Sequence, residues 1–400
     1  MRKPAYFIVS VLAVLTSACT ERSLPVFFES TPMSIPAGQP AEGPRLSQGA
    51  DGTVIVSWME RGDETASLRY SEYADGKWGP ATHAVTDPEM FINWADLPGV
   101  LATGEDRRLA FWLSRIADAP YAYQILYAQS GDGGATWSEP LSPHNDGTPT
   151  EHGFVSTYPA AAGTGLVWLD GRETPDAGMT LRAAVVSDNG EIESGALLDD
   201  HVCDCCQTDV AITADGPLVV FRDRSEDEIR DIYAKRLIDG QWQPGVAIGS
   251  DGWEIAGCPV NGPAVAATDD FVAVAWFTAA NEKAIVKTAY SSNAGTTFST
   301  PIELSGKAPL GHVGVAIIDQ HSYAVSWLEA DQKDTYALKI RGLTSDGQVG
   351  PVSTVGRTAL PHIVPQMRRA GDKLILAWTD EITGVRKVVS VKVPIAGFYD

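Results

Sequence analysis

Thiols are the side chains of this sequence whose spacing suggests chemistry most directly. Cys203, Cys205 and Cys206 stand within four consecutive positions, Cys258 follows further along the chain, and Cys19 is close to the N-terminus. Without Cys19 an even number remains, which in an oxidising compartment predicts two disulfides in any of three pairings. Adjacent cysteines are crowded for structural bridges alone. A redox-active thiol, or a soft metal such as Cu or Zn, therefore stays open as an alternative.

Histidines would provide the imidazole ligands that such a metal site needs. The hypothesis then uses four cysteines and two histidines as ligands: Cys203, Cys205, Cys206, Cys258, His152 and His312. In the competing hypothesis each histidine is a hydrogen-bonded loop residue and the cysteines form disulfides. Outside the metal hypothesis, no cofactor is expected.

Arginines recur three or four residues after the aromatic residue of a repeated pattern. They are Arg61, Arg115, Arg172 and Arg224, and Arg222 lies in the same segment as Arg224. The planar guanidinium binds carboxylates through two parallel hydrogen bonds, so this series predicts a substrate-binding site for an anion. Surface ion pairs with neighbouring acidic residues are the alternative.

Carboxylates near the same positions provide candidates for acid–base catalysis. The three that we predict as catalytic are Asp96, Asp170 and Asp223, and Glu151 and Asp380 are further candidates. These carboxylates can act in catalysis only if the fold brings them to one place.

A repeat of about fifty residues must position all of these groups, and such a period of short strands is typical of β-propeller blades. Each repeat has a β-type run that ends in an aromatic residue: Trp58, Trp112, Trp168, Phe221, Trp276, Trp327 and Trp378. We predict an all-β chain with a single propeller of four-stranded antiparallel blades over residues 41–400. Seven blades are favoured and six are the alternative. The last repeat has three candidate strands, so residues 24–28 are a possible closing strand.

The propeller register predicts which residues meet at the axis. The loop that enters each innermost strand and the loop after each second strand open on the same face, the mouth. Counting back from each repeated aromatic gives the residues of the entering loops: Glu42, Asp96, His152, Cys205, Cys206, Asn261, His312 and His362. Polar side chains and thiols from distant parts of the chain should therefore converge there.

Composition excludes several classes of protein. Acidic residues outnumber basic ones by 51 to 30, giving a net charge of −21, so the basic surface that nucleic acids require is missing. The 38 glycines and 25 prolines argue against long helices. No amphipathic helix or heptad pattern suggests association, and we expect a monomer.

The N-terminus has the pattern of an export signal. Arg2 and Lys3 precede a short apolar run that ends in small residues, and Cys19 follows Ala18 directly. This resembles a bacterial lipoprotein signal, which implies a signal peptide at 1–18, lipidation of Cys19 and a linker at 19–40. The expected location is the cell envelope, as an outer-membrane lipoprotein, and plain secretion is the alternative.

A second motif connects the chain to a known superfamily. The segment 130–137, SGDGGATW, fits the Asp-box pattern S-x-D-x-G-x-T-W, and 292–298, SNAGTTF, is a close variant. Asp or Asn accepts backbone N–H groups in such a turn and glycine takes the positive φ. The chain thus resembles the sialidase (BNR/Asp-box) superfamily and, over its cysteine segments, uncharacterised bacterial exported sialidase-like proteins.

The resemblance implies more about fold than about activity. Sialidases of this superfamily use three arginines, an aspartate acid/base and a tyrosine–glutamate nucleophile pair. Here Asp96 stands where the first arginine belongs, and Tyr158 near Glu151 is only a guess for the pair. An exo-glycosidase activity is therefore predicted with an incomplete catalytic set.

Three functions follow for the envelope protein. The first is binding or hydrolysis of an anionic glycan at the mouth, which predicts that Arg115 and Arg224 converge beside Asp96 or Asp170. The second is metal binding or thiol redox chemistry at the cysteines and histidines. The third is a non-catalytic interaction scaffold.

Overall fold

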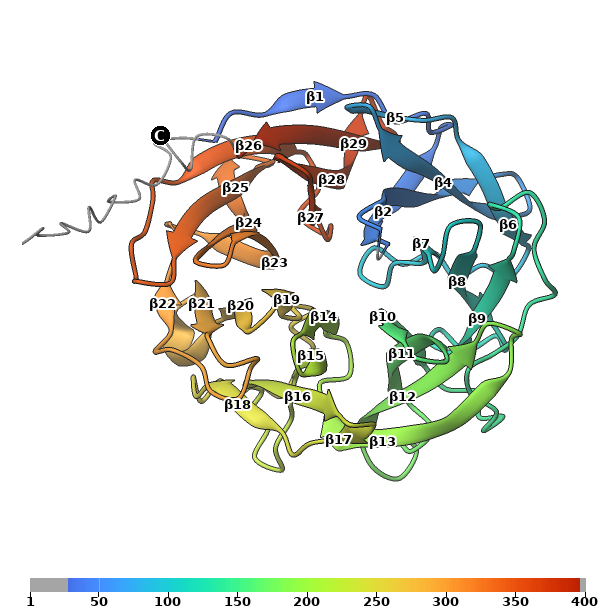
Figure 1. Cartoon of the computed structure of the whole chain (residues 1–400), viewed down its shortest axis with the longest axis horizontal. Coiled ribbons are helices and arrows are strands. Elements are labelled where there is room, and N and C mark those ends of the chain that lie inside the picture. The colour runs from blue at the N-terminus through green and yellow to red at the C-terminus, as the bar shows by residue number, and fades with distance from the viewer. Residues whose placement is uncertain (1–27, 50, 305, 396–400) are drawn as a thin grey trace, which may run out of the picture.

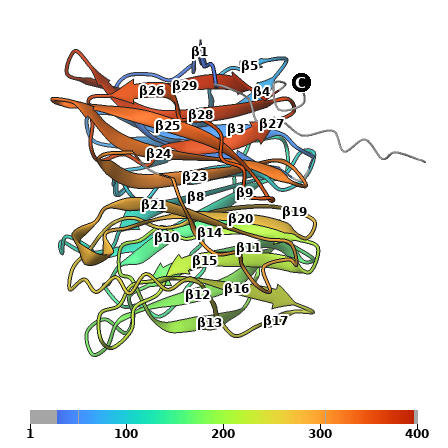
Figure 2. The same cartoon turned by 90° about the vertical axis from the view of Figure 1, so that its left-hand side faces the viewer.

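Seven β-sheets are arranged around a central axis in the computed structural model, which describes residues 28–49, 51–304 and 306–395 (Figure 1). The predicted all-β fold and the seven blades are confirmed. Figure 2 shows the ring from the side, with the strands of neighbouring blades stacked on one another. The predicted signal peptide, Cys19 and residues 24–27 lie outside the described residues. Among the described residues, no helix is long and apolar enough to cross a membrane.

The blades follow one another along the chain, each beginning with its innermost strand. Blade 1 contains β2 (Ala41–Gln48), β3 (Val54–Arg61), β4 (Ala66–Ala74), β5 (Lys77–Trp78) and β6 (Thr82–Asp87). Blade 2 contains β7 (Gly99–Ala102), β8 (Arg108–Arg115) and β9 (Tyr123–Ser130). Blade 3 contains β10 (His152–Ala160), β11 (Gly163–Asp170), β12 (Met179–Ser187) and β13 (Ile192–Val202).

The second half of the ring repeats this order. Blade 4 contains β14 (Asp209–Thr213), β15 (Gly216–Arg222), β16 (Ile232–Ile238), β17 (Gln241–Trp242) and β18 (Val246–Gly249). Blade 5 contains β19 (Ala264–Thr268), β20 (Phe271–Thr278), β21 (Ile285–Ser291) and β22 (Ile302–Glu303), with a 3-10 turn η1 (Ala280–Glu282). Blade 6 contains β23 (Pro309–Asp319), β24 (Ser322–Gln332), β25 (Thr335–Thr344) and β26 (Ser353–Thr358). Blade 7 contains β27 (Gln366–Ala370), β28 (Lys373–Ile382), β29 (Val385–Pro394) and β1 (Thr31–Met33).

Blade 7 is completed by the N-terminal strand β1, which pairs antiparallel with β29. Thr31 lies opposite Lys392, so both ends of the described chain meet in one sheet. Among the described residues, the strand that closes the ring is β1, which begins after the predicted segment 24–28. Phe28, the one described residue of that segment, is buried between blades 6 and 7 and donates its N–H to Ser353 Oγ at 2.8 Å.

The repeated aromatic residues form the contacts between blades. Each lies in the second strand of its blade and packs in an apolar cluster with the preceding blade; Trp112, for example, packs with Ile55 and Leu68 of blade 1. Trp58 packs with Ile375 of blade 7, which closes the ring of clusters. The fifty-residue period is therefore the period of the interblade core. It sets the rotation of each blade and, with it, the positions of the mouth loops.

Candidate functional site

The axial opening at the mouth is narrow. A cavity of about 70 Å³ is lined by the entries to the inner strands and includes Asp96, Asp209, His312, Arg45 and Arg368. Small-molecule sites usually enclose roughly 300 Å³ or more, so this cavity is too small for a sugar ring. A wider cavity of about 680 Å³ follows along the inner strands.

Trp94 covers the axis above this opening. It belongs to the loop before β7 in blade 2, yet its ring contacts His312 of blade 6 and His362 before blade 7, with centroids 5.6 and 5.2 Å away. Gln207, from the entry to blade 4, donates to Ala95 O at 2.9 Å and holds the same loop. Groups that act on a large substrate must therefore lie beside the axis.

Asp96, Tyr123 and Glu151 form such a group, here called the carboxylate–tyrosine cluster. The Tyr123 hydroxyl donates to Glu151 Oε1 at 2.6 Å and lies 3.4 Å from Asp96 Oδ2. Tyr123 and Asp96 are buried, and Glu151 is half-buried at the mouth. Gly153 makes the approach possible, because a Cβ there would collide with Asp96 Oδ2. One phenol oxygen thus connects two carboxyl groups.

Both carboxyl groups of this cluster have strongly shifted pKa values. Burial and the charge of Glu151 raise the pKa of Asp96 to about 7, against hydrogen bonds from the Phe154 backbone and Tyr123. Burial raises the pKa of Glu151 to about 7 as well; Tyr123 opposes the shift and Asp204 adds to it. Carboxyl groups that titrate near neutrality are suited to general acid–base catalysis.

Arg115 lies next to this cluster. It is opposite Tyr123 in the β8–β9 ladder, so the two side chains share one face of the sheet. Its guanidinium lies 4.6 Å from the centroid of the Phe91 ring, which stacks on Tyr123 at 4.3 Å. Arg115 is exposed, and among the described residues no carboxylate lies within ion-pair distance of it. It can therefore bind an external anion.

The other arginines of the predicted series are engaged within the protein. Arg224 binds Asp204 at 3.0 Å and Glu228, and Arg61 binds Glu42 at 2.6 Å. Neither Arg115 nor Arg224 lines the axial cavity. Of the two, Arg115 lies next to the cluster that contains Asp96, and Arg224 is held by Asp204 and Glu228.

Arg222 has a structural environment. It is 2 % exposed and donates to three backbone carbonyls, of Asn261, Arg230 and Phe277, at 3.0, 2.6 and 2.6 Å. These bonds link blade 4 to the beginning and the second strand of blade 5. Its donors are therefore not available to a substrate.

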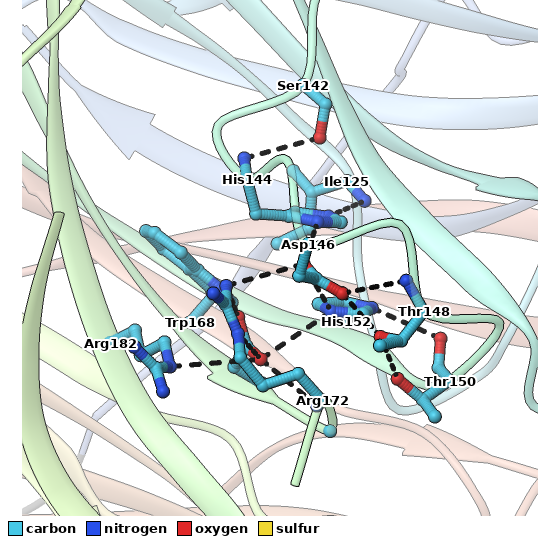
Figure 3. Close-up of polar contacts among 12 residues, drawn as sticks. Ile125, Ser142, His144, Asp146, Thr148, Thr150, His152, Trp168, Arg172 and Arg182 are labelled. Carbon is cyan, nitrogen blue, oxygen red and sulfur yellow. Dashed lines mark hydrogen bonds and ion pairs between the residues drawn. The ribbon is translucent and has the colours of Figure 1, made fainter. Parts of the chain in front are cut away.

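A second group on the same face is called the histidine cluster. Figure 3 labels four of its members, His144, Asp146, His152 and Arg172, and the fifth is Asp170, which contacts His152 and Arg172. Asp146 Oδ2 lies 3.0 Å from His144 Nδ1 and 3.2 Å from His152 Nε2. Asp170 binds Arg172 through two hydrogen bonds of 2.7 Å. The loop that carries His144 and Asp146 ends at Glu151, so this cluster also holds the loop of the carboxylate–tyrosine cluster.

Within the histidine cluster, both ring nitrogens of His144 are already engaged. His144 Nε2 accepts the Ile125 N–H at 3.3 Å, so its Nδ1 carries the hydrogen that points to Asp146 and has no lone pair for a metal. Arg172 already lies between Asp170 and Asp146, at 2.7 and 3.4 Å. Burial opposes the charge on Asp170, but the hydrogen bonds from Arg172 keep its pKa below the ordinary value. Asp170 is thus a buried partner of Arg172.

The cysteines differ from the ligand set that the metal hypothesis requires. Cys205 and Cys258 form a disulfide, and Cys203 and Cys206 are free and buried, with their sulfur atoms 2.7 Å apart. In a tetrahedral site with Zn–S bonds of about 2.3 Å, two sulfur ligands lie further apart than this. Cys203 and Cys206 are therefore too close together to bind one metal ion side by side. The set of four thiolate ligands is therefore wrong.

The histidines of that ligand set lie elsewhere. His152 belongs to the histidine cluster. The His312 ring packs on Trp94, and the backbone N–H of His312 donates to Asn261 Oδ1 at 2.8 Å. Burial lowers the pKa of His312 to about 4. The ligands of the single mixed site in the sequence hypothesis thus lie in three places: the cysteine pairs, the histidine cluster and the contact of His312 with Trp94.

Of the predicted catalytic carboxylates, only Asp96 lies in the carboxylate–tyrosine cluster. Asp223 is in blade 4, where burial and Asp199 raise its pKa to about 6. Sequence reasoning missed Tyr123 because it considered the loops before the first and after the second strand, whereas the third strand also begins at the mouth. His144 and Asp146 were missed because they lie in the interior of a long entering loop. Their signal was the run HNDGTPTEH ahead of an inner strand.

No family model and no curated protein matches the sequence significantly. Solved structures do match. The polysaccharide lyase Uly1 superposes with a TM-score of 0.51 at 10% identity, over 88% of this chain and 89% of that one. The endosialidase of phage phi92 has a TM-score of 0.51 at 8% identity, over 92% and 70% of the two chains. The expected sialidase-like propeller fold is confirmed, and at this identity the likeness concerns the fold.

Proposed function

We propose that this chain is a carbohydrate-active propeller that binds and hydrolyses an anionic glycan at the mouth, beside Glu151. The observation that carries the proposal is the carboxylate–tyrosine cluster, in which one phenol connects two carboxyl groups that titrate near neutrality. The fold favours a glycan, because two proteins that share it are named a polysaccharide lyase and an endosialidase. Arg115 favours an anionic one.

In this proposal Glu151 is the group that meets the substrate, because it is the half-buried member of the cluster. Protonated Glu151 gives its proton to the glycosidic oxygen as the C–O bond breaks. The Tyr123 hydroxyl then stabilises the Glu151 carboxylate through its hydrogen bond. Water attacks the sugar carbon and returns a proton to Glu151. Asp96 lies behind the phenol and favours a proton on the cluster, since two adjacent charges in a buried place repel each other.

The change Glu151→Gln tests this role. It keeps the shape of the side chain but removes the titrating group, and we expect the turnover number on a sensitive anionic glycan to fall by about 10²–10⁴-fold. The matched control is Glu226→Gln, at an exposed position of blade 4. Screening uses sialylated and uronate-containing oligosaccharides with detection of new reducing ends. Equal turnover in both variants and the wild type would refute the proposal.

The change Arg115→Ala tests the anion site. Loss of a charge-assisted contact to substrate should raise KM by about tenfold or more, since such hydrogen bonds contribute roughly 1.5–3 kcal/mol. Neutral glycans should be unaffected. Arg61→Ala serves as the control, because Arg61 is paired with Glu42 in blade 1. Equal KM changes in the two variants would contradict a specific role for Arg115.

We also propose that the protein is exported and anchored to the bacterial cell envelope by lipid on Cys19. The support is the N-terminal sequence alone, with its basic start, apolar run and cysteine after Ala18. The mass of the mature N-terminal peptide tests this. A diacylglyceryl adduct on Cys19 is expected, and a mature chain that begins elsewhere would leave plain secretion.

A further inference from the structure

The four cysteines of blades 4 and 5 form two pairs of different accessibility. Cys203 and Cys206 are buried, at 0% and 1% exposure, and both are free. The disulfide of Cys205 and Cys258 lies next to them but reaches the surface, because Cys258 is exposed. The sulfur atoms of Cys203, Cys205 and Cys206 all lie within 4.8 Å of one another. A buried dithiol therefore stands beside a surface disulfide.

The environment of Cys203 favours its thiolate form. Arg230, itself 2% exposed, directs Nη1 at Cys203 Sγ at 3.3 Å. Burial alone would raise the pKa of Cys203, but the hydrogen bond from Cys206 and the charges of Arg222 and Arg230 lower it to about 6. Burial and the neighbouring Cys203 raise the pKa of Cys206. This asymmetry, across a C-x-x-C spacing, gives one nucleophilic sulfur and one that stays protonated until it is needed.

We propose that these four cysteines are a thiol–disulfide exchange site in which the buried dithiol passes two electrons to the surface pair, which then reduces an external disulfide. In the first step the Cys203 thiolate bonds to Cys205 Sγ and the Cys205–Cys258 bond breaks. Cys258 leaves with the electron pair and takes a proton from water. In the second step Cys206 loses its proton, bonds to Cys203 Sγ and releases Cys205 as a thiolate.

The exchange conserves electrons, because one disulfide is replaced by another. The product has a buried Cys203–Cys206 bond and free thiols at Cys205 and exposed Cys258. The Cys258 thiolate then attacks an external disulfide, which gives a mixed disulfide and releases one external thiol. Cys205 attacks the mixed disulfide at Cys258, restores the Cys205–Cys258 bond and releases the second external thiol. The electrons that reduce the external disulfide come from the Cys203–Cys206 pair. Only Cys258 needs to be accessible, which agrees with the burial of the other three sulfurs.

Thiol mapping tests the internal exchange. The full-length protein is brought to the state with one disulfide by a defined ratio of reduced to oxidised dithiothreitol and quenched in acid. It is then alkylated in denaturant with N-ethylmaleimide, and labelled peptides are identified by mass spectrometry. We expect label on Cys258 in a measurable fraction of the wild type and its loss in Cys203→Ser. Absence of Cys258 label in the wild type, or equal label in both, would overturn the proposal.

Reaction with oxidised glutathione tests the external step. The wild type should reduce it with little accumulated adduct, whereas Cys206→Ser should hold glutathione on Cys258, because its Cys205 stays bonded to Cys203. Should a serine variant fail to fold, Arg230→Gln is the second test. It should slow exchange at pH 7 by about tenfold, because loss of the Arg230 hydrogen bond raises the pKa of Cys203 and lowers the thiolate fraction. An unchanged rate in Arg230→Gln would contradict the role given to Cys203.

Discussion

Tyr123 has two acidic neighbours but only one proton to donate, so only one of the two carboxyl groups receives a short hydrogen bond. The short hydrogen bond goes to Glu151 at 2.6 Å, and Asp96 Oδ2 remains at 3.4 Å. Asp96 is therefore a buried carboxyl group whose charged form is poorly compensated, and its pKa rises to about 7. Burial of this carboxyl group lowers the stability of the folded protein as pH rises above the ordinary pKa of aspartate, and such costs are common at functional sites.

The variant Asp96→Asn tests this cost. Between the ordinary pKa near 3.8 and the folded value near 7, the folded protein holds a proton that the unfolded chain has lost. Native stability from this group is thus full at low pH and falls as pH rises through that window. Relative to wild type, the free energy of unfolding of Asp96→Asn should improve by up to about 4 kcal/mol from pH 4 to pH 8.

Urea unfolding at several pH values measures this difference. Asp63→Asn, at an exposed position before β4, is the control and should show no such trend. A constant difference between Asp96→Asn and wild type across the pH range would show that the pKa of Asp96 is the same in the folded and the unfolded protein, and would contradict the raised pKa.

At the scale of elements, the loop of residues 142–151 decides where Glu151 lies. Its position depends on Asp146, which contacts His144 within the loop, His152 at the start of β10 and Arg172 just after β11. Burial opposes the charge of Asp146, but hydrogen bonds from Thr148 and the nearby cations hold its pKa below the ordinary value. A buried ion network therefore holds this loop in place, and removing one member of such a network is costly.

The variant His144→Phe keeps an aromatic ring at this position of the loop but removes the titratable imidazole. Burial and His152 lower the pKa of His144 to about 4, so the unfolded chain binds a proton there that the folded protein rejects between pH 6.5 and 4. The wild type should therefore lose up to about 3 kcal/mol of stability from this group as pH falls through that window. His144→Phe should be less stable at pH 8 and lose less on acidification. Thermal unfolding at pH 4.5 and 8 measures both; parallel losses would contradict the assignment.

For the molecule as a whole, the repeat pattern was sufficient to predict the fold. Trp58, Trp112 and their equivalents are spaced by the blade period because each must fill the same interblade cluster, and that requirement is visible in sequence. The register also placed Asp96 at the axis correctly. The register could not show that Trp94 covers the axis, nor that the Arg222 guanidinium donates hydrogen bonds to three backbone carbonyls. Those outcomes depend on side-chain packing between blades, which has no sequence period.

The pairing of β1 with β29 also determines when the protein can become complete. Thr31 can pair with Lys392 only after the chain has been synthesised as far as β29, so β1 stays without its partner strand until then. Contacts of such long sequence separation form slowly. A chain that has not yet released β29 from the ribosome therefore cannot complete blade 7 and close the ring.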